Sequence, residues 1–338
     1  MKLNAEQIHD ICQGAVRVNE SDTGVQLFRF TAEQEAYYLK TNVNFHKKAL
    51  AAAGMKLCFE TDSRSLFLKV YVTPGSTRTY FSFDVTVDGS IIGHLDNFIE
   101  EEVPEIYTTM QGELGEFSKN FDLGEGTKKV CVYLPWSVAV EIREISVDDN
   151  AFIKPLKPAK KLLVFGDSIT QGYDALRPMN RYAAKLADAL GAEEINKGIG
   201  AEKFCPQLVK LQDDFEPEYI LVAYGTNDWT HVEEADFMVR CREFYETLSR
   251  NYPNSVIWAL TPIWRGDCDG ERVFGAFDKV AEDMQKITEP FKNIVCINGF
   301  DLVPHDDRFF ADGRLHPNDK GFACYFEGLW ESLKQYVI

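Results

Sequence analysis

The pattern of hydrophobic and polar positions changes near residue 155 of this 338-residue chain. Before that point, apolar residues fall in short runs rich in β-branched and aromatic side chains, such as SLFLKVYV, TYFSFDVTVDG and KKVCVYLPW. Gly, Pro and Asp separate the runs, which is typical of antiparallel strands joined by hairpins. Asn4 and Gln7 have the spacing of a capping box and predict a helix over 4–13. We therefore expect one short helix followed by a β-sandwich of jelly-roll type.

The second part of the chain alternates apolar runs with longer segments of helical character. The strand candidates are KLLVFG, EEINKG, YILVAYG, SVIWALTP and NIVCINGF, and the helical segments include 178–190, 233–250 and 271–288. This alternation predicts an α/β domain with a doubly wound parallel sheet, a three-layer flavodoxin-like arrangement. Ligands of such sheets bind at the carboxyl ends of the strands.

The segment IKPLKPAKK, which begins at Ile153, holds two prolines and four lysines and disfavours both a helix and a central strand. We place an N-terminal β-sandwich domain at 1–152, a linker at 153–160 and the α/β domain at 161–338. Two domains also agree with the length of the chain, because domains usually have about 100–200 residues.

Charge and composition exclude several classes of partner. Lys and Arg number 36 against 53 Asp and Glu, and the net charge of −17 disfavours binding to nucleic acid or to an anionic membrane. The chain start lacks the order of a secretory signal, and no apolar run approaches the length of a membrane span. We therefore expect a cytoplasmic protein.

Cysteine and histidine positions show no metal-ligand spacing. The eight cysteines form no CxxC pair and several lie in apolar runs, so we expect buried, reduced thiols. The six histidines are scattered, and no P-loop or dinucleotide motif follows a strand. Neither a metal nor a cofactor is expected.

Polar residues follow several of the predicted strands. Ser168 in FGDSITQG stands at a strand-to-helix turn, and INKGIGAEKF forms a glycine-containing turn after the next strand. Asn227 in YGTNDWTH follows a buried strand, and ADGRLHPNDKGF places Asp312 and His316 before the last helix. Each feature alone also fits an ordinary cap or turn. Together they combine a nucleophile, a general base and oxyanion donors.

This set resembles the SGNH hydrolases, the GDSL family of serine esterases, whose name gives Ser, Gly, Asn and His in this chain order. The resemblance covers roughly 161–338. It implies that Ser168 is the nucleophile and that its N–H is one oxyanion donor. Asn227 would be a second donor through its side chain. His316 would be the general base, oriented by Asp312, and a backbone N–H of the second motif would complete the oxyanion hole.

Two positions depart from the family pattern. The family's donor glycine is replaced by Ala201, whose N–H keeps its place if its φ is negative, and Gly200 is the alternative donor. Asp312 lies four residues before His316, whereas the family usually has three. If Asp312 does not reach His316, the candidates are a backbone carbonyl, Asp306, Asp307 or a Ser/His dyad.

The sequence indicates the substrate less clearly than the type of reaction. A sandwich before such a domain resembles two-domain carbohydrate esterases, which remove acetyl groups from sugars, so the expected substrate is a small acylated sugar. Trp229, Trp264 and Tyr173 are candidates to contact the sugar, and Trp229 and Trp264 fit core packing equally well. Two other classes stay open: a lipid or acyl-thioester hydrolase, and a non-catalytic glycan-binding protein. The sandwich itself could shape the site, bind a glycan or build a homo-oligomer.

Overall fold

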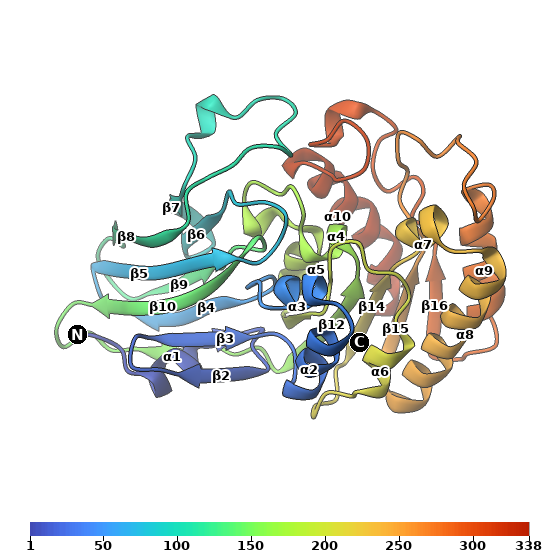
Figure 1. The fold of residues 1–338 in the computed structure, drawn as a ribbon. Helices are drawn as coiled ribbons and strands as arrows, with labels where there is room; N and C mark the ends of the chain where they lie inside the picture. The colour runs from blue at the N-terminus through green and yellow to red at the C-terminus, as the bar shows by residue number, and fades with distance from the viewer. Residues whose placement is uncertain (338) are drawn as a thin grey trace. The chain divides into compact units, whose positions relative to one another are not determined.

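The computed structural model describes residues 1–337 and divides them into two compact units (Figure 1). The first unit contains Met1–Ala159 and Leu176–Met179, and the second contains Lys160–Ala175 and the residues from Asn180 onward. The chain thus changes unit next to the end of the expected linker. Inside this linker, Lys154–Pro155 forms a short strand, β11, that pairs with β4 (Lys56–Thr61) and so belongs to the first unit.

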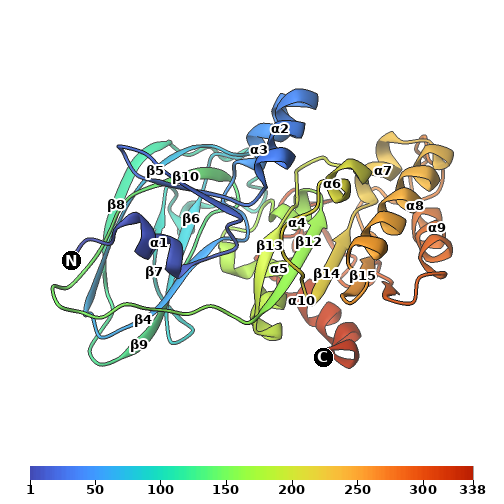
Figure 2. The same ribbon diagram turned by 90° about the horizontal axis from the view of Figure 1, so that it is seen from below.

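Two antiparallel sheets make up the first unit (Figure 2). One has the order β1-β4-β9-β6-β7, and its further strands are β1 (Cys12–Gln13), β9 (Lys128–Tyr133), β6 (Ser82–Val87) and β7 (Ser90–Asp96). The other has the order β2-β3-β10-β5-β8, with β2 (Arg17–Glu20), β3 (Val25–Phe28), β10 (Val138–Val147), β5 (Ser65–Pro74) and β8 (Gly115–Asp122). The predicted sandwich-like fold is confirmed.

Strand β5 shows why these sequence runs form a sandwich. Leu66, Leu68, Val70 and Val72 are buried, while the residues between them are half-buried or exposed. Successive side chains of a strand point to opposite faces, so this alternation buries one face against the apolar core.

Local sequence signals place the helices of the first unit. The capping box of Asn4 and Gln7 is present and begins α1 (Ala5–Ile11), as predicted. Two further helices, α2 (Ala32–Thr41) and α3 (Val43–Ala49), lie where only strands were expected. Thr31 and Gln34 form a second capping box at the start of α2, and this spacing could have revealed the helix.

The cysteine prediction is wrong for one pair. Cys58 of β4 lies opposite Cys131 of β9, with 4.3 Å between their Cα atoms, and the two are joined by a disulfide. The other six cysteines form no disulfide within residues 1–337. The cytoplasmic location stays a prediction, because disulfides are typical of oxidising compartments. Among residues 1–337, no helix has the length and apolar character needed to cross a membrane.

Leu176–Met179 belongs to the first unit through polar contacts of the buried Arg177 and of Met179. The Arg177 guanidinium donates to Ser82 Oγ (2.9 Å) and Asp96 Oδ2 (2.8 Å), and it pairs with Glu100. The amide of Met179 donates to Asp84 Oδ2 (3.1 Å). No sequence signal indicated this excursion.

The second unit has a five-stranded parallel sheet with the order β13-β12-β14-β15-β16. Its strands are β12 (Lys160–Gly166), β13 (Ala192–Asn196), β14 (Tyr219–Ala223), β15 (Val256–Leu260) and β16 (Ile294–Ile297). All five coincide with the predicted apolar runs, and the predicted α/β class is confirmed. The strand order reverses between β12 and β14, the point where ligands bind in such sheets.

Helices cover both faces of this sheet. They are α4 (Ser168–Gln171), α5 (Tyr182–Leu190), α6 (Pro206–Lys210), α7 (Thr226–His231), α8 (Glu234–Asn251), α9 (Asp278–Thr288) and α10 (Asp319–Leu333). Figure 2 shows α5 with α10 on one face and α6 with α8 on the other, and the same pairs contact each other. Helix α9 begins at Asp278, later than the predicted 271, because the preceding residues form turns.

Candidate active site

Ser168 lies at a sharp strand-to-helix turn. Strand β12 ends at Gly166, Asp167 caps α4 by accepting the Ile169 amide (3.0 Å), and Ser168 is the first residue of the helix. A Cβ at Gly166 would collide with Thr170, so the turn requires glycine. The N–H of Ser168 is one of the N-terminal amides with no acceptor in its own helix, as an oxyanion donor must be.

His316 joins Ser168 to Asp312. Its Nε2 lies 2.9 Å from Ser168 Oγ, and its Nδ1 lies 2.9 Å from Asp312 Oδ2. Because an ionised carboxylate only accepts, Nδ1–H donates to Asp312 and Nε2 accepts the Ser168 hydroxyl. A serine hydroxyl, an imidazole and a carboxylate in this sequence form the geometry of a catalytic triad.

The longer Asp312-to-His316 spacing is absorbed by one tight turn. Asp312 Oδ1 accepts the amides of Arg314 (3.0 Å), Leu315 (2.6 Å) and His316 (3.1 Å). Gly313 has a φ of 66°, a left-handed conformation that glycine adopts without strain. Asp312 therefore reaches His316 despite the extra residue.

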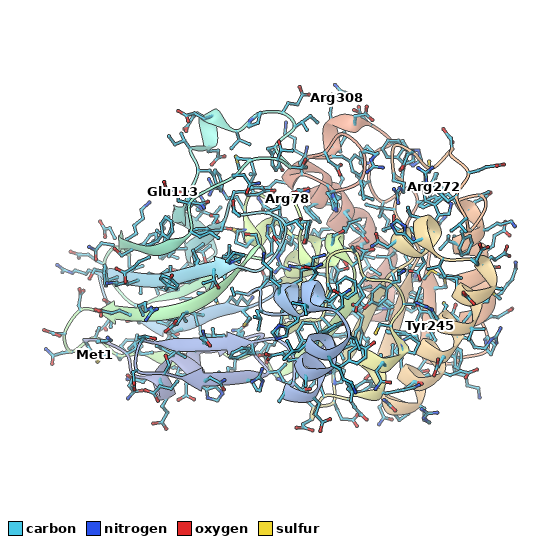
Figure 3. All side chains as sticks on the ribbon, viewed as in Figure 1. Met1, Arg78, Glu113, Tyr245, Arg272 and Arg308 are labelled. Atoms are coloured by element: carbon cyan, nitrogen blue, oxygen red, sulfur yellow. A yellow bond between two sulfur atoms is a disulfide. The ribbon has the colours of Figure 1, made fainter. Side chains whose placement is uncertain are left out.

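The other aspartates considered for this role point elsewhere. Asp306 accepts from the backbone and side chain of Arg308, whose side chain projects from the surface (Figure 3). Asp307 is exposed. The acid contacting His316 Nδ1 at hydrogen-bond distance is Asp312.

The charge state of Asp312 suits its position. Burial alone would raise the pKa of its carboxyl, but the hydrogen bond and charge of His316, with the amides of Leu315 and His316, hold the pKa well below its usual range. Asp312 is therefore a carboxylate at neutral pH.

The segment after α4 packs directly against His316. The ring of Tyr173 stacks on the imidazole, with 5.6 Å between centroids and 28° between planes. Asp174 Oδ2 lies 3.5 Å from His316 Nδ1, and Asp174 is fully buried. Tyr173, a candidate to contact the sugar, is thus buried beside the His316 ring, and its contact with a sugar stays a prediction. Asp174 was missed, although an acidic residue six positions after the serine was a visible signal.

The second motif favours Ala201 over Gly200 as oxyanion donor. The Gly200 amide donates to Gln171 Oε1 (2.9 Å), whereas the Ala201 amide has no acceptor among residues 1–337. The φ of Ala201 is 69°, so the condition of a negative φ is not met. Its N–H is nevertheless available, at the cost of a strained alanine.

Asn227 is held beside this turn. Its Nδ2 donates to the carbonyl of Glu202 (3.1 Å), the residue after Ala201. The amide group has two N–H bonds, so one remains for a substrate oxygen. Gly225, which precedes α7 with a φ of 118°, lets the chain turn from β14 into this helix.

Two buried acids lie beneath these motifs. Burial raises the pKa of Asp167 to about 6 and that of Asp228 to about 7. Asp228 accepts the amide of Phe204 through both oxygens (3.3 Å each), which links α7 to the second motif.

A buried ion pair fixes the start of the second motif. Arg181 donates to both oxygens of Glu194 (2.8 and 3.0 Å), and Asn196 Nδ2 donates to Glu194 Oε1 and to the carbonyl of Thr170 (both 2.8 Å). Asn196 thereby connects the end of β13 to the helix that begins with Ser168.

The two tryptophans have different environments. Trp229 has no exposed surface, its indole N–H donates to the carbonyl of Gly275 (2.9 Å), and its ring packs on Phe277. Its predicted contact with sugar is therefore wrong. Trp264 is half-buried and stacks on His305, with 5.3 Å between centroids.

Asp174, Asp312 and His316 also form a group of potential metal ligands, with ligand atoms within 4.8 Å of one another. The observed donors and acceptors fit a proton-transfer site better, because His316 uses one ring nitrogen for Asp312 and the other for Ser168.

Residues 164–324 match the model of the GDSL-like lipase/acylhydrolase family. The comparison with curated protein sequences yields no match.

Solved structures share the whole fold at low identity. They include a salicylyl-acyltransferase from a tetracycline biosynthetic pathway (18% identity, 96% of this chain and 94% of that chain, TM-score 0.78). A protein from Bacteroides ovatus described as a GDSL-like lipase has 20% identity, 99% and 97% coverage and a TM-score of 0.78. A family two carbohydrate esterase from Clostridium thermocellum in complex with cellohexaose has 14% identity, 96% and 98% coverage and a TM-score of 0.65.

At such identities these likenesses concern the fold, and the chemistry rests on the site and the family match. Residues 164–324 are a GDSL-like lipase/acylhydrolase domain, which supports an ester hydrolase.

Proposed function

We propose that the protein hydrolyses small acyl esters, O-acetyl esters of carbohydrates above all, with Ser168 as nucleophile. The observation that carries the proposal is the continuous contact from Ser168 Oγ through His316 to Asp312, with 2.9 Å at each step. A serine needs such a base to lose its proton as it attacks a carbonyl.

The reaction has two acyl-transfer steps. Ser168 Oγ attacks the ester carbonyl, and its proton moves to His316 Nε2. The oxyanion accepts hydrogen bonds from the amides of Ser168 and Ala201 and from Asn227. His316 then protonates the leaving alcohol, and the acyl group stays on Ser168.

Water completes the cycle. His316 takes a proton from water, the resulting hydroxide attacks the acyl-enzyme, and the acid leaves as Ser168 regains its proton. Asp312 stays a carboxylate throughout, because its depressed pKa prevents it from taking the proton of His316 Nδ1.

Two observations support an acetylated sugar as substrate. The family two carbohydrate esterase with the same two-domain layout was solved with cellohexaose. Trp264 is half-buried, and aromatic side chains of this kind stack on sugar rings.

The test is mass spectrometry of acetylated mono- and oligosaccharides after incubation with the enzyme. We expect loss of acetyl groups with the wild type and with Ser332→Ala, and none with Ser168→Ala. Ser332 is a suitable control because it lies on α10 and bonds only to the helix backbone. Acetate release by Ser168→Ala would overturn the mechanism.

A series of p-nitrophenyl esters separates the acetyl esterase from a lipid or acyl-thioester hydrolase. We expect the highest kcat/KM for the acetate. A kcat/KM that rises with chain length would overturn the acetyl-ester proposal and favour a lipase. Glycan binding without turnover would favour the binding protein.

A further inference from the structure

We propose that Asp174 is a second acid for His316, a positioning residue that acts together with Asp312. This inference rests on the proposed roles of Ser168 and His316. It concerns a residue that the sequence motifs do not include.

Two carboxylates converge on one nitrogen. Asp312 Oδ2 lies 2.9 Å from His316 Nδ1, and Asp174 Oδ2 lies 3.5 Å from the same atom. The first distance is that of a hydrogen bond, and the second is that of an ion pair. Nδ1–H therefore donates to Asp312, and Asp174 faces the same N–H from a second direction.

The turn that begins at Ser168 places Asp174 beside His316. The amides of Gly172 and Tyr173 both donate to the carbonyl of Ser168 (3.0 and 2.9 Å) and close α4. Gly172 and Asp174 have φ values of 112° and 70°, which bend the chain back toward the base. Residues 168–174 thus supply both the nucleophile and the second acid.

The burial of Asp174 strengthens the interaction of its charge with the His316 ring. Asp174 has no exposed surface, and the stacked ring of Tyr173 covers the imidazole beside it. A buried carboxylate interacts more strongly with a neighbouring cation than an exposed one does, because water does not screen it. The left-handed backbone of a non-glycine residue also costs free energy, as is common where function requires a particular placement.

Asp174 matters when His316 becomes charged. As the proton of Ser168 Oγ moves to Nε2, the imidazole turns into an imidazolium between two carboxylates. Nδ1–H keeps its bond to Asp312. A third acid, Asp167, is buried next to Ser168, and its charge also acts on His316.

A double-mutant cycle tests the proposal. Asn has the shape of Asp and tolerates a positive φ, so Asp174→Asn removes the charge and keeps the fold. We measure kcat and KM for p-nitrophenyl acetate in Asp174→Asn, Asp312→Asn and the double variant. Asp88→Asn is the matched control, since Asp88 also has a positive φ (49°) but lies in the β6–β7 turn of the first unit.

We expect Asp174→Asn to lower kcat by about 3–10-fold when Asp312 is present and by about 100-fold when it is absent. The double variant should approach the ~10⁴-fold loss seen when a triad histidine loses its only acid. KM should stay within about twofold, and Asp88→Asn should match the wild type. An equal factor in both backgrounds would mean that Asp174 acts only on the fold and would overturn the inference.

If Asp174→Asn folds poorly, chemical rescue by formate distinguishes the loss of the charge from the loss of structure. Asp174→Gly suits the φ of 70° and leaves a cavity the size of the carboxylate. In the Asp312→Asn background, formate should raise the kcat of Asp174→Gly at least tenfold and leave that of Asp174→Asn unchanged. Absence of rescue in a folded variant overturns the inference. Activity of Ser168→Ala would instead overturn the proposed function itself.

Discussion

Asp312 binds the histidine side chain with one carboxylate oxygen and the backbone leading to that histidine with the other. Both oxygens of a single residue thus shape the turn and orient the base. The turn needs the left-handed φ of Gly313, so the backbone conformation at Gly313 and the placement of the His316 ring are linked.

Gly313→Ala should therefore affect both stability and turnover. A Cβ in the left-handed region costs about 1–2 kcal/mol, and a relaxed turn would pull Asp312 away from His316. We expect a lower Tm and a kcat reduced severalfold at unchanged KM. Gly126→Ala is the matched control, because Gly126 also has a positive φ (81°) but lies in the first unit. If both variants kept full kcat, the turn would not control the acid.

Asn227→Ala should lower kcat by about 10²–10³, the usual cost of removing one oxyanion donor. Asn227→Asp should be at least as slow, because it places a negative charge where the oxyanion develops. Steady-state kinetics with p-nitrophenyl acetate measure both, with the exposed Asn120→Ala as control. Full turnover by Asn227→Ala would remove this residue from the oxyanion hole.

Ala201→Gly should stabilise the protein. The φ of 69° strains alanine, and glycine removes about 1 kcal/mol of that strain while keeping the N–H in place. We expect a raised Tm and a kcat within about twofold of the wild type. Ala235→Gly, at an exposed position of α8, should instead lower the Tm. A destabilised Ala201→Gly would contradict the assigned strain.

Asp228→Asn should raise stability in a pH-dependent way. Burial raises the folded-state pKa of Asp228 from 3.8 to about 7. Between these values the unfolded chain releases the proton and the folded chain keeps it, so the wild type loses stability as pH rises. Asparagine does not titrate and still accepts from Phe204.

The Tm gain of Asp228→Asn should therefore grow from pH 4 to pH 7 and then level off. It corresponds to a few kcal/mol at most, since each pKa unit is about 1.4 kcal/mol. Thermal unfolding at several pH values measures it, with the exposed Asp22→Asn as control. A gain that does not vary with pH would show that Asp228 ionises normally.

Periodicity and local spacing predicted much of this protein. The period-2 pattern of β5 and the apolar runs of the parallel sheet depend on neighbours within one strand, so they can be read from a short window. The cap of α1 is equally local. The chain order of Ser168, Asn227 and His316, each at a strand end or near a helix start, indicates that they lie at one edge of the sheet.

Tertiary structure decided the features that depend on close approach between distant segments. The register of β4 and β9 brings Cys58 and Cys131 together across 73 positions, which no spacing rule reveals. Trp229 is buried because Phe277, almost fifty residues away in the chain, packs on it. Residue type alone does not tell such an aromatic from one at a binding site.

The active site shows the same division at the scale of single atoms. Sequence indicated which residues are candidates for the chemistry, because a nucleophile, a base and an acid must be of particular types. The backbone angles at Gly313 and Asp174 decide whether Asp312 and Asp174 reach His316. A change of the φ angle at either residue would move a carboxylate by several ångströms. Only the packing of the folded chain selects the observed angles.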